Sequence, residues 1–203
     1  MESLYGPYAP FLPKVAEDVE TKILAIGEAE RERTGHGVIE HVRTRIKAEE
    51  SMREKCLRRG FEPSAYSALR EIHDSVGIRV VTRFIDELFL IADRLRELPD
   101  TRIVSEKDYV RSAKPNGYRS YHMILEITEP FTDILGRTPG GWIVEVQLRT
   151  IAMDTWASLE HELRYKQDVA NERLIAQELK RVADELASCD VSMQTIRNLI
   201  HAS

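Results

Sequence analysis

Residues 142–150 read Trp-Ile-Val-Glu-Val-Gln-Leu-Arg-Thr, and this stretch decides the fold. Apolar residues alternate there with polar ones, the two-residue period of a β-strand, so one face carries Glu145, Gln147 and Arg149. The turn signal Thr138-Pro-Gly-Gly141 precedes the strand, and residues 120–128 before that turn also read as a strand. A hairpin is therefore predicted. A solvated outer face explains such alternation most simply. However, a helical pattern follows at once and could cover the polar face.

The periodicity of apolar residues in the rest of the chain predicts a mixed order of strands and helices. Further strands are predicted around residues 42–47, 76–80 and 102–107. Helical spacing of apolar residues occurs in segments 12–26, 86–98, 150–166 and 175–200, and Ser51 is expected to cap a short helix bearing Lys55, Arg58 and Arg59. This order predicts an α+β fold, a mixed five-stranded sheet covered by helices, with N- and C-terminal helices.

The bulk composition fits one folded domain with an appended helix. The 203 residues are 42% hydrophobic and 31% charged, and the net charge is −5. Residues 41–60 nevertheless hold seven Lys or Arg against three Glu, and such a confined basic patch favours a small, highly charged ligand over a long nucleic acid. The two cysteines are far apart and no apolar run reaches membrane-spanning length, so we expect a cytoplasmic protein.

The tail has the most regular period in the chain. Its apolar residues are spaced by alternating steps of four and three: Ile175, Leu179, Val182, Leu186, Cys189, Met193, Ile196 and Ile200. A seam this narrow usually packs on another helix. Two partners fit the pattern equally well, the chain's own N-terminal helix and a second subunit.

Two other segments carry candidate functional groups. In Asp74-Ser-Val-Gly-Ile-Arg79 the carboxylate and the arginine are an odd number of residues apart, so Asp74 is predicted to precede the strand that holds Arg79. Alone, this motif is explained more simply by a structural turn than by a metal site beside a phosphate. Residues 108–122 combine a Pro-Asn-Gly turn with Lys114 and Tyr118, which offer a cation for phosphates and a flat face for a base.

Taken together, these segments resemble the synthetase domain of the RelA/SpoT family, which makes the guanosine tetra- and pentaphosphate alarmones. More specifically, the chain resembles a small, single-domain alarmone synthetase over about residues 38–166. The markers are Arg45-Ile-Lys47 with Ser51 and Lys55, Asp74-x-x-Gly-x-Arg79, Asp108-Tyr109, Asn116-Gly-Tyr118-Arg-Ser-Tyr-His122, Glu145-Val-Gln147-Leu-Arg149-Thr150, and Met153-x-x-Trp156-Ala-x-x-Glu160-His161 through Tyr165-Lys166. One marker would be weak, but all occur in the family's order. The resemblance implies a nucleotidyltransferase-like sheet.

The resemblance also implies a role for each marker residue. For ATP, Arg45 and Arg79 would sandwich the adenine. Lys47, Lys55 and Arg58 would hold the phosphates, and Ser51 would also belong to the ATP-binding residues. For GDP or GTP, Tyr118 would stack on guanine and Asp154 would read its edge. Lys107, Lys114 and His122 would hold the 5′-phosphates. Asn116 and Gln147 would also belong to the residues that bind GDP or GTP. Asp74 and Glu145 would bind Mg²⁺ and act in catalysis.

The implied reaction is attack of the acceptor's ribose 3′-hydroxyl on the β-phosphorus of ATP, with AMP leaving and Glu145 activating the hydroxyl. Phosphoryl transfer depends mainly on positioning and charge stabilisation, so a site dense in Lys, Arg and Mg²⁺ is expected.

The resemblance further implies a division of the chain and its partners. Residues 1–37 would form an N-terminal helical segment, 38–166 the synthetase domain, and 167–203 an oligomerisation helix. A homo-tetramer is favoured over a dimer, and RNA is not indicated. The chain begins too near the synthetase region for the hydrolase domain of the long bifunctional enzymes, so we expect synthesis without degradation. Product-activated tetrameric relatives typically read Phe-Val-Thr-Gly-Arg where residues 41–45 read His-Val-Arg-Thr-Arg, so the resemblance does not extend to product activation.

Two rival functions keep the same fold. Some toxin relatives transfer pyrophosphate to the 3′ end of tRNA or to adenosine nucleotides. Retention of Lys107, Lys114 and His122 favours an acceptor with free 5′-phosphates. The second rival is a catalytically silent nucleotide- or RNA-binding regulator, which intact Asp74 and Glu145 disfavour.

Overall fold

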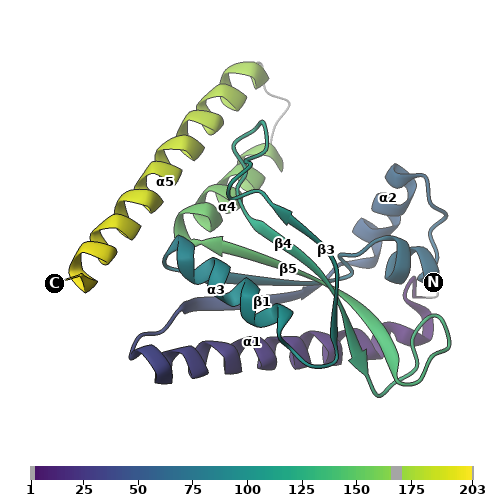
Figure 1. Ribbon diagram of the computed structural model, residues 1–203. Coiled ribbons are helices and arrows are strands. Elements are labelled where there is room, and N and C mark those ends of the chain that lie inside the picture. Colours follow the sequence, from purple (N-terminus) through teal and green to yellow (C-terminus); the bar gives the residue numbers. More distant parts are fainter. Residues whose placement is uncertain (1–2, 166–170, 203) are drawn as a thin grey trace.

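The computed structural model describes residues 3–165 and 171–202, and its centre is one five-stranded mixed sheet (Figure 1). The strand order is β1-β2-β5-β4-β3. Only β2 and β5 pair in parallel among these strands, and the other three pairs are antiparallel. The strands are β1 (Ile39–Ile46), β2 (Val76–Thr82), β3 (Thr101–Asp108), β4 (Tyr121–Glu129) and β5 (Gly140–Thr150). The predicted mixed five-stranded sheet and the β4–β5 hairpin are confirmed.

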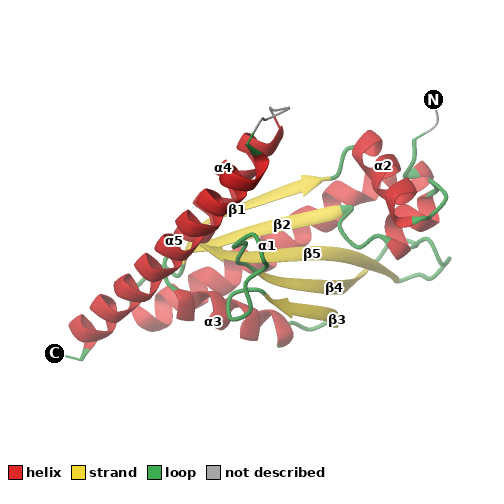
Figure 2. Cartoon of the chain, turned by 90° about the horizontal axis from the view of Figure 1, so that it is seen from above, coloured by secondary structure: helices red, strands yellow, loops and turns green. Residues whose placement is uncertain are grey.

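Helices bury one face of this sheet. The helices are α1 (Leu12–Thr34), α2 (Glu49–Arg59), α3 (Ile85–Arg96), α4 (Ile151–Tyr165) and α5 (Glu172–His201), with short 3₁₀ and π turns at Gly6–Phe11 and Ser67–Glu71. Helices α1 and α3 pack on β1, β2 and β5, whereas α2 lies near one end of the sheet and α4 and α5 toward the other (Figures 1 and 2). None of the described helices is apolar over a length that would cross a bilayer.

Alternation along the strands separates a buried face from a polar one. Val144, Val146 and Leu148 of β5 are fully buried in the core, together with Ile78 and Val80 of β2. The polar side chains between them are half-buried on the opposite face, flanked by α2 and α4. Asp74 precedes β2, which begins at Val76, as its odd spacing from Arg79 predicts.

The C-terminal end of α1 and the N-terminal end of α2 are stabilised in different ways. Helix α1 ends at Thr34 before Gly35, whose φ of 77° is the left-handed conformation of a helix C-cap and whose N–H donates to the Arg31 carbonyl. The predicted cap of α2 is wrong. That helix begins at Glu49 after Ala48, and Ser51 is exposed on its first turns. Glu49 and Glu50 supply the negative charge that stabilises a helix N-terminus, so no hydroxyl cap is needed.

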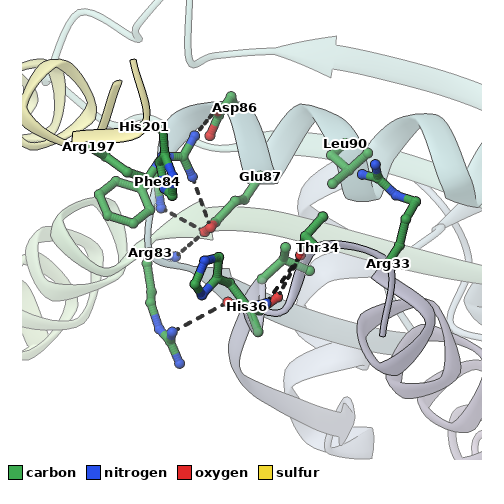
Figure 3. A pocket seen from close by; sticks show the side chains of 12 residues that line it. Arg33, Thr34, His36, Arg83, Phe84, Asp86, Glu87, Leu90, Arg197 and His201 are labelled. Atoms are coloured by element: carbon green, nitrogen blue, oxygen red, sulfur yellow. Dashed lines mark hydrogen bonds and ion pairs between the residues drawn. The ribbon is translucent and has the colours of Figure 1, made fainter. Parts of the chain in front are cut away.

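Helix α5 does not lie along α1, so the chain's own N-terminal helix is not the partner of its seam. It packs on α4 and reaches α3 near its C-terminal end. There Arg197 pairs with Asp86 and Glu87 and stacks on Phe84, 4.4 Å from the ring centre (Figure 3). Much of the seam stays exposed: Met193, Ile196 and Ile200 are 50%, 51% and 68% exposed. Leu159 and Leu163 of α4 are also more than half exposed.

Candidate active site

Two hollows on the polar face of the sheet meet at one carboxylate. The first, about 540 Å³, is here called the carboxylate cleft; its lining includes Asp74, Glu145, Lys55, Arg59, Lys107, Tyr109, Lys114 and His122. The second, about 180 Å³, is called the arginine slot; it is lined by Arg43, Thr44, Arg45, Gly77, Ile78, Arg79, Glu145 and Gln147. Glu145 lines both, so two ligands bound in them would meet at this side chain.

Strand pairing brings these residues together. Glu145 lies opposite Gly77 in the parallel β2–β5 pair, and Arg45 lies opposite the same glycine in the β1–β2 pair. On the other side, Gln147 lies opposite His122, and His122 lies opposite Lys107. Because residues directly opposite one another point to the same face, four strand pairings build one continuous polar surface. A Cβ on Gly77 would lie 3.6 Å from Cγ of Arg45, so the arginine crosses directly over the glycine.

Asp74 holds two lysines from different elements. Its Oδ2 lies 2.6 Å from Nζ of Lys55 on α2 and 3.0 Å from Nζ of Lys47 after β1. Its Oδ1 is buried and has no hydrogen-bond partner among the described residues. A buried carboxylate oxygen without a donor is costly in free energy, and it is therefore available for a ligand. The structure thus places two lysines that share one carboxylate, and the unbonded oxygen of that carboxylate, at the same point.

Glu145 is an ionised carboxylate in a partly enclosed position. Burial would raise its pKa, but hydrogen bonds from His122 and Gln147 and the nearby charges of His122 and Lys55 lower the pKa to about 2. The contacts are His122 Nδ1 to Oε1, 3.1 Å, and Gln147 Nε2 to Oε2, 2.8 Å. Because an ionised carboxylate only accepts, the Nδ1 of His122 donates to it.

Tyr118 continues this hydrogen-bond chain away from the cleft. Its hydroxyl lies 2.8 Å from Nε2 of His122 and accepts from Nη2 of Arg149 at 3.0 Å. The ammonium of Lys114 sits 4.6 Å from the centre of the Tyr118 ring and equally far from that of Tyr109. One hydrogen-bond chain therefore joins Arg149, Tyr118, His122 and Glu145, and a cation stands over the tyrosine face.

Asp154 lies between the two groups of predicted residues. Its Oδ1 is 2.9 Å from Nη1 of Arg149 and 3.2 Å from Nη1 of Arg79, while its Oδ2 is 4.0 Å from Nε2 of His41. Burial and the neighbouring guanidinium of Arg149 lower the pKa of Arg79. The side chain predicted to read guanine is thus paired to an arginine predicted to hold adenine.

Six predicted site residues line neither hollow. Lys47, Tyr118 and Asp154 contact residues that do, whereas Ser51, Arg58 and Asn116 stand apart. Ser51 and Arg58 are exposed on α2, where Arg59 rather than Arg58 joins Lys55 in lining the cleft. Asn116 uses its Oδ1 to accept the N–H of Tyr118 at 3.2 Å, which shapes the turn.

Several residues of the site were not predicted, among them Arg59, which lines the cleft, and Arg149 and Tyr109. Arg149 is 5% exposed and bonds Tyr118, Gln147 and Asp154. Its alternation with Glu145 and Gln147 along β5 was the signal that could have identified it. Tyr109 pairs with Lys114 and packs edge-on against His122, and only its place in the Asp108-Tyr109 marker pointed to it.

The residues present fit a divalent cation that shares its coordination with phosphates. No group of three or more His, Cys, Asp or Glu side chains is placed to hold a metal within residues 3–165 and 171–202. Mg²⁺, however, is commonly bound by one or two carboxylates plus substrate phosphates and water. The ionised Glu145 lines one cleft together with Asp74, whose Oδ1 has no partner in the described part of the chain, and these two carboxylates would be available to such a cation.

A separate hollow of about 680 Å³ lies near the C-terminal end of α5 (Figure 3). Its arginines are already paired: Arg83 with Glu40, Arg33 with Glu30, and Arg197 with Asp86 and Glu87. The carboxylate cleft differs because Lys107 and Lys114 extend into it without a paired carboxylate among the ion pairs of the described residues. The cleft is therefore the better site for an anionic ligand.

Comparison with known proteins agrees with the geometry. A family model described as "Region found in RelA / SpoT proteins" matches residues 44–170. The chain is 36% identical over 179 residues to the GTP pyrophosphokinase YwaC of Bacillus subtilis, covering 88% of this chain and 83% of the relative. It is 28% identical to YjbM of the same organism over 91% of this chain and 84% of the relative.

Solved structures give the same picture. The small alarmone synthetase 2 from Bacillus subtilis superposes with a TM-score of 0.80 at 36% identity, covering 92% of this chain and 94% of the other. The small alarmone synthetase 1 from the same organism, bound to its product pppGpp, has a TM-score of 0.81 at 28% identity and 96% coverage of both chains.

Proposed function

This chain belongs to the RelA/SpoT family, and from that membership we propose that it synthesises guanosine tetra- and pentaphosphate by transferring pyrophosphate from ATP to the ribose 3′-hydroxyl of GDP or GTP. The observation that carries the proposal is the position of Glu145, an ionised carboxylate shared by the arginine slot and the carboxylate cleft. A transfer reaction requires that the reacting groups of the two nucleotides meet, and a side chain that lines both hollows marks the place where they would.

For the donor, we assign the adenine of ATP to the arginine slot. Arg45 and Arg79 line it from neighbouring strands, and guanidinium planes stack well on aromatic rings. The triphosphate would then extend toward Lys47 and Lys55, which Asp74 holds together at 3.0 and 2.6 Å. Their attraction to Asp74 keeps the two ammonium groups close until the phosphates provide stronger partners.

For the acceptor, we assign GDP or GTP to the carboxylate cleft. Lys107, Lys114 and His122 would hold the 5′-phosphates, and Tyr118 would stack on guanine after the Lys114 ammonium leaves its ring for the phosphates. Asp154 would accept hydrogen bonds from the guanine edge, which requires that it give up part of its pairing with Arg79 and Arg149.

The chemistry is an in-line displacement at phosphorus. The acceptor's 3′-oxygen forms a bond to the β-phosphorus of ATP while the bond from that phosphorus to the α–β bridging oxygen breaks. AMP leaves with the bridging oxygen, and the proton of the 3′-hydroxyl passes to the carboxylate of Glu145. Lys47, Lys55 and the other cations stabilise the charge on the transferred group. Mg²⁺ held by Asp74 and Glu145 would neutralise phosphate charge.

The low pKa of Glu145 bears on this assignment. A pKa of about 2 makes the resting carboxylate a weak base, and its hydrogen bond from His122 is the main cause that lowers it. When His122 binds the acceptor's phosphates instead, Glu145 loses that donor and becomes more basic. The acceptor would thus activate the base that deprotonates it.

The decisive experiment incubates the purified protein with ATP labelled in the β-phosphate, together with GDP, GTP, AMP or tRNA in separate reactions. We expect label in GDP and GTP only, with release of AMP. Label confined to tRNA or to AMP would replace the proposal with one of the toxin-type reactions, and no label in any acceptor would favour a silent nucleotide-binding protein.

Tyr118→Ala is expected to weaken GDP binding by about tenfold or more, because stacking on a base contributes about 1–3 kcal/mol. ATP affinity should stay within about twofold, since within the described residues Tyr118 is linked to the arginine slot only indirectly, through Arg149 to Gln147 and through His122 to Glu145. Titration calorimetry with each nucleotide measures both. Tyr118→Phe is the matched control: it keeps the ring and removes only the hydroxyl. Equal losses for GDP and ATP would refute the stacking role.

We also propose that the exposed seam of α5 pairs with another copy of the chain, with a tetramer favoured over a dimer. The support is the row of exposed apolar side chains on a 30-residue helix, including Val182, Met193, Ile196 and Ile200. Burial of such a row favours association by the hydrophobic effect. Light scattering should give a multiple of the 23.3 kDa chain, and a monomer at micromolar concentration would remove this part of the proposal.

A further inference from the structure

The loop between β3 and β4, residues 109–120, lies beside α5 in both views of the chain (Figures 1 and 2). It carries Lys114 and Tyr118, which are assigned above to the acceptor. Its two ends are joined by a hydrogen bond from the Tyr109 N–H to the Ser120 carbonyl, 3.0 Å, and its tip by one from the Gly117 N–H to the Lys114 carbonyl, 2.8 Å. These bonds fix the shape of the tip, so its position depends on what it packs against.

The tip packs directly on α5 at Gly117. This glycine is buried and has a φ of 92°, and a Cβ added to it would lie 2.5 Å from the Cβ of Ala183 and 3.5 Å from the Cα of Lys180. Real Cβ atoms do not approach that closely, so a glycine backbone faces a small side chain here for steric reasons. Ala183 is itself only 4% exposed.

The part of α5 that bears Ala183 is fixed to the rest of the site on both sides. One turn before it, the Leu179 carbonyl accepts the indole N–H of Trp156 at 2.8 Å. Two turns after it, Asp190 accepts the Thr150 hydroxyl at 2.6 Å, and Thr150 Oγ1 in turn accepts the N–H of Met153 at 3.2 Å. Both partners belong to the end of β5 and to α4, which also hold Arg149 and Asp154.

Little space is left at this contact. The hollow among Gly117, Trp156, Ala183 and Asp190 has a volume of about 10 Å³, at the lower limit for a single water. The loop cannot approach α5 more closely, and any larger side chain at position 183 must push Gly117 away. Tyr118 would move with it, away from His122 and Arg149, to which its hydroxyl is bonded.

We infer that α5 is a positioning element of the acceptor half of the site, and that Ala183 acts through Gly117 to set where Tyr118 stands. Ala183 touches neither nucleotide in this assignment. The inference rests on the proposed function for the identity of the acceptor. It assigns to α5 a role in acceptor affinity that is separate from its exposed seam.

The test is Ala183→Leu, compared with Ala176→Leu, which adds the same side chain to an exposed position of the same helix. We expect the KM for GDP, and the Kd for a fluorescent GDP analogue, to rise about tenfold, because overpacking is relieved by displacing the loop. The KM for ATP and kcat at saturating GDP should stay within about twofold of the wild-type values. Circular dichroism and thermal melting establish that each variant is folded.

A second experiment, which exchanges the side chains of residues 117 and 183, tests the inference even if Ala183→Leu does not fold. Gly117→Ala should weaken GDP binding, and the double variant Gly117→Ala/Ala183→Gly should recover part of it, because the second change removes the atom that the first one meets. Recovery is partial, since a left-handed φ still disfavours alanine at position 117. The inference is overturned if the exchange recovers nothing, or if Ala183→Leu leaves GDP affinity unchanged or weakens ATP and GDP equally. A wild-type protein that binds GDP but transfers no pyrophosphate would refute the proposed function, while the GDP affinities would still test the positioning role.

Discussion

Replacing Glu145 by Gln should lower the rate of pyrophosphate transfer between about 10²- and 10⁴-fold, the range that a positioned general base contributes. The amide keeps the size of the side chain and can still accept a hydrogen bond from His122, but it cannot take the 3′-hydroxyl proton. Because a neutral amide also loses a cation ligand, the effect is expected toward the upper part of that range. Single-turnover transfer from labelled ATP to GDP measures the chemical step directly.

Nucleotide binding separates this effect from a general loss of structure. Each nucleotide alone should bind Glu145→Gln within about threefold of the wild-type affinity, because the assigned phosphate and base contacts come from other side chains. Glu106→Gln on β3 is the matched control, since Glu106 is exposed and bonds Arg96 and Tyr121 away from the cleft. Undiminished turnover in Glu145→Gln would remove the residue from its catalytic role.

The pH dependence follows from the same carboxylate. A group whose pKa in the folded protein is lowered to about 2 is ionised at every pH above about 4, so Glu145 contributes no acid limb to kcat/KM of the free enzyme in that range. Any limb seen between pH 5 and 8 must then come from another group, and it should persist in Glu145→Gln if residual activity allows its measurement.

The fold was largely predictable because its signals are local. Alternation along residues 142–150 identified both the strand and its polar face, the Thr138-Pro-Gly-Gly141 turn identified the hairpin, and the odd spacing between Asp74 and Arg79 placed Asp74 before β2. Strand order is not local. Nothing in the sequence pattern by itself puts Gly77 beside Glu145, and it is this parallel pairing that joins the arginine slot to the carboxylate cleft.

The tail shows why apolar spacing alone was insufficient. The stripe of α5 that packs on the rest of the chain includes Ala183 and Asp190, each one residue beyond a seam position, Val182 or Cys189. A small residue is needed where the Gly117 backbone approaches, and a carboxylate is needed where Thr150 donates. Hydrophobic periodicity detects neither requirement, so it included exposed positions such as Met193 and Ile196 and missed Ala183 and Asp190.

Replacing Asp74 by Asn should lower transfer by about 10²-fold or more, because it removes one of the two carboxylates assigned to the cation and one fixed charge at the reacting phosphates. The same change acts in the opposite direction on metal-free ATP. Asp74 competes with phosphates for Lys47 and Lys55, to which it is bound at 3.0 and 2.6 Å. Without that competitor, ATP in the presence of a chelator should bind at least as tightly as it does to the wild type.

This opposition of rate and affinity makes the experiment specific. Removal of one partner from a partly buried ion cluster leaves like charges unpaired. We therefore also expect ligand-free Asp74→Asn to unfold at a lower temperature, because its free energy of unfolding falls by roughly 1–3 kcal/mol. ATP should stabilise this variant more than it stabilises the wild type. Asp93→Asn, on the exposed side of α3, is the control for loss of one charge. If metal-free ATP bound more weakly to Asp74→Asn, Asp74 would be supporting the triphosphate site directly rather than competing for its lysines, and its assignment to the cation would fall.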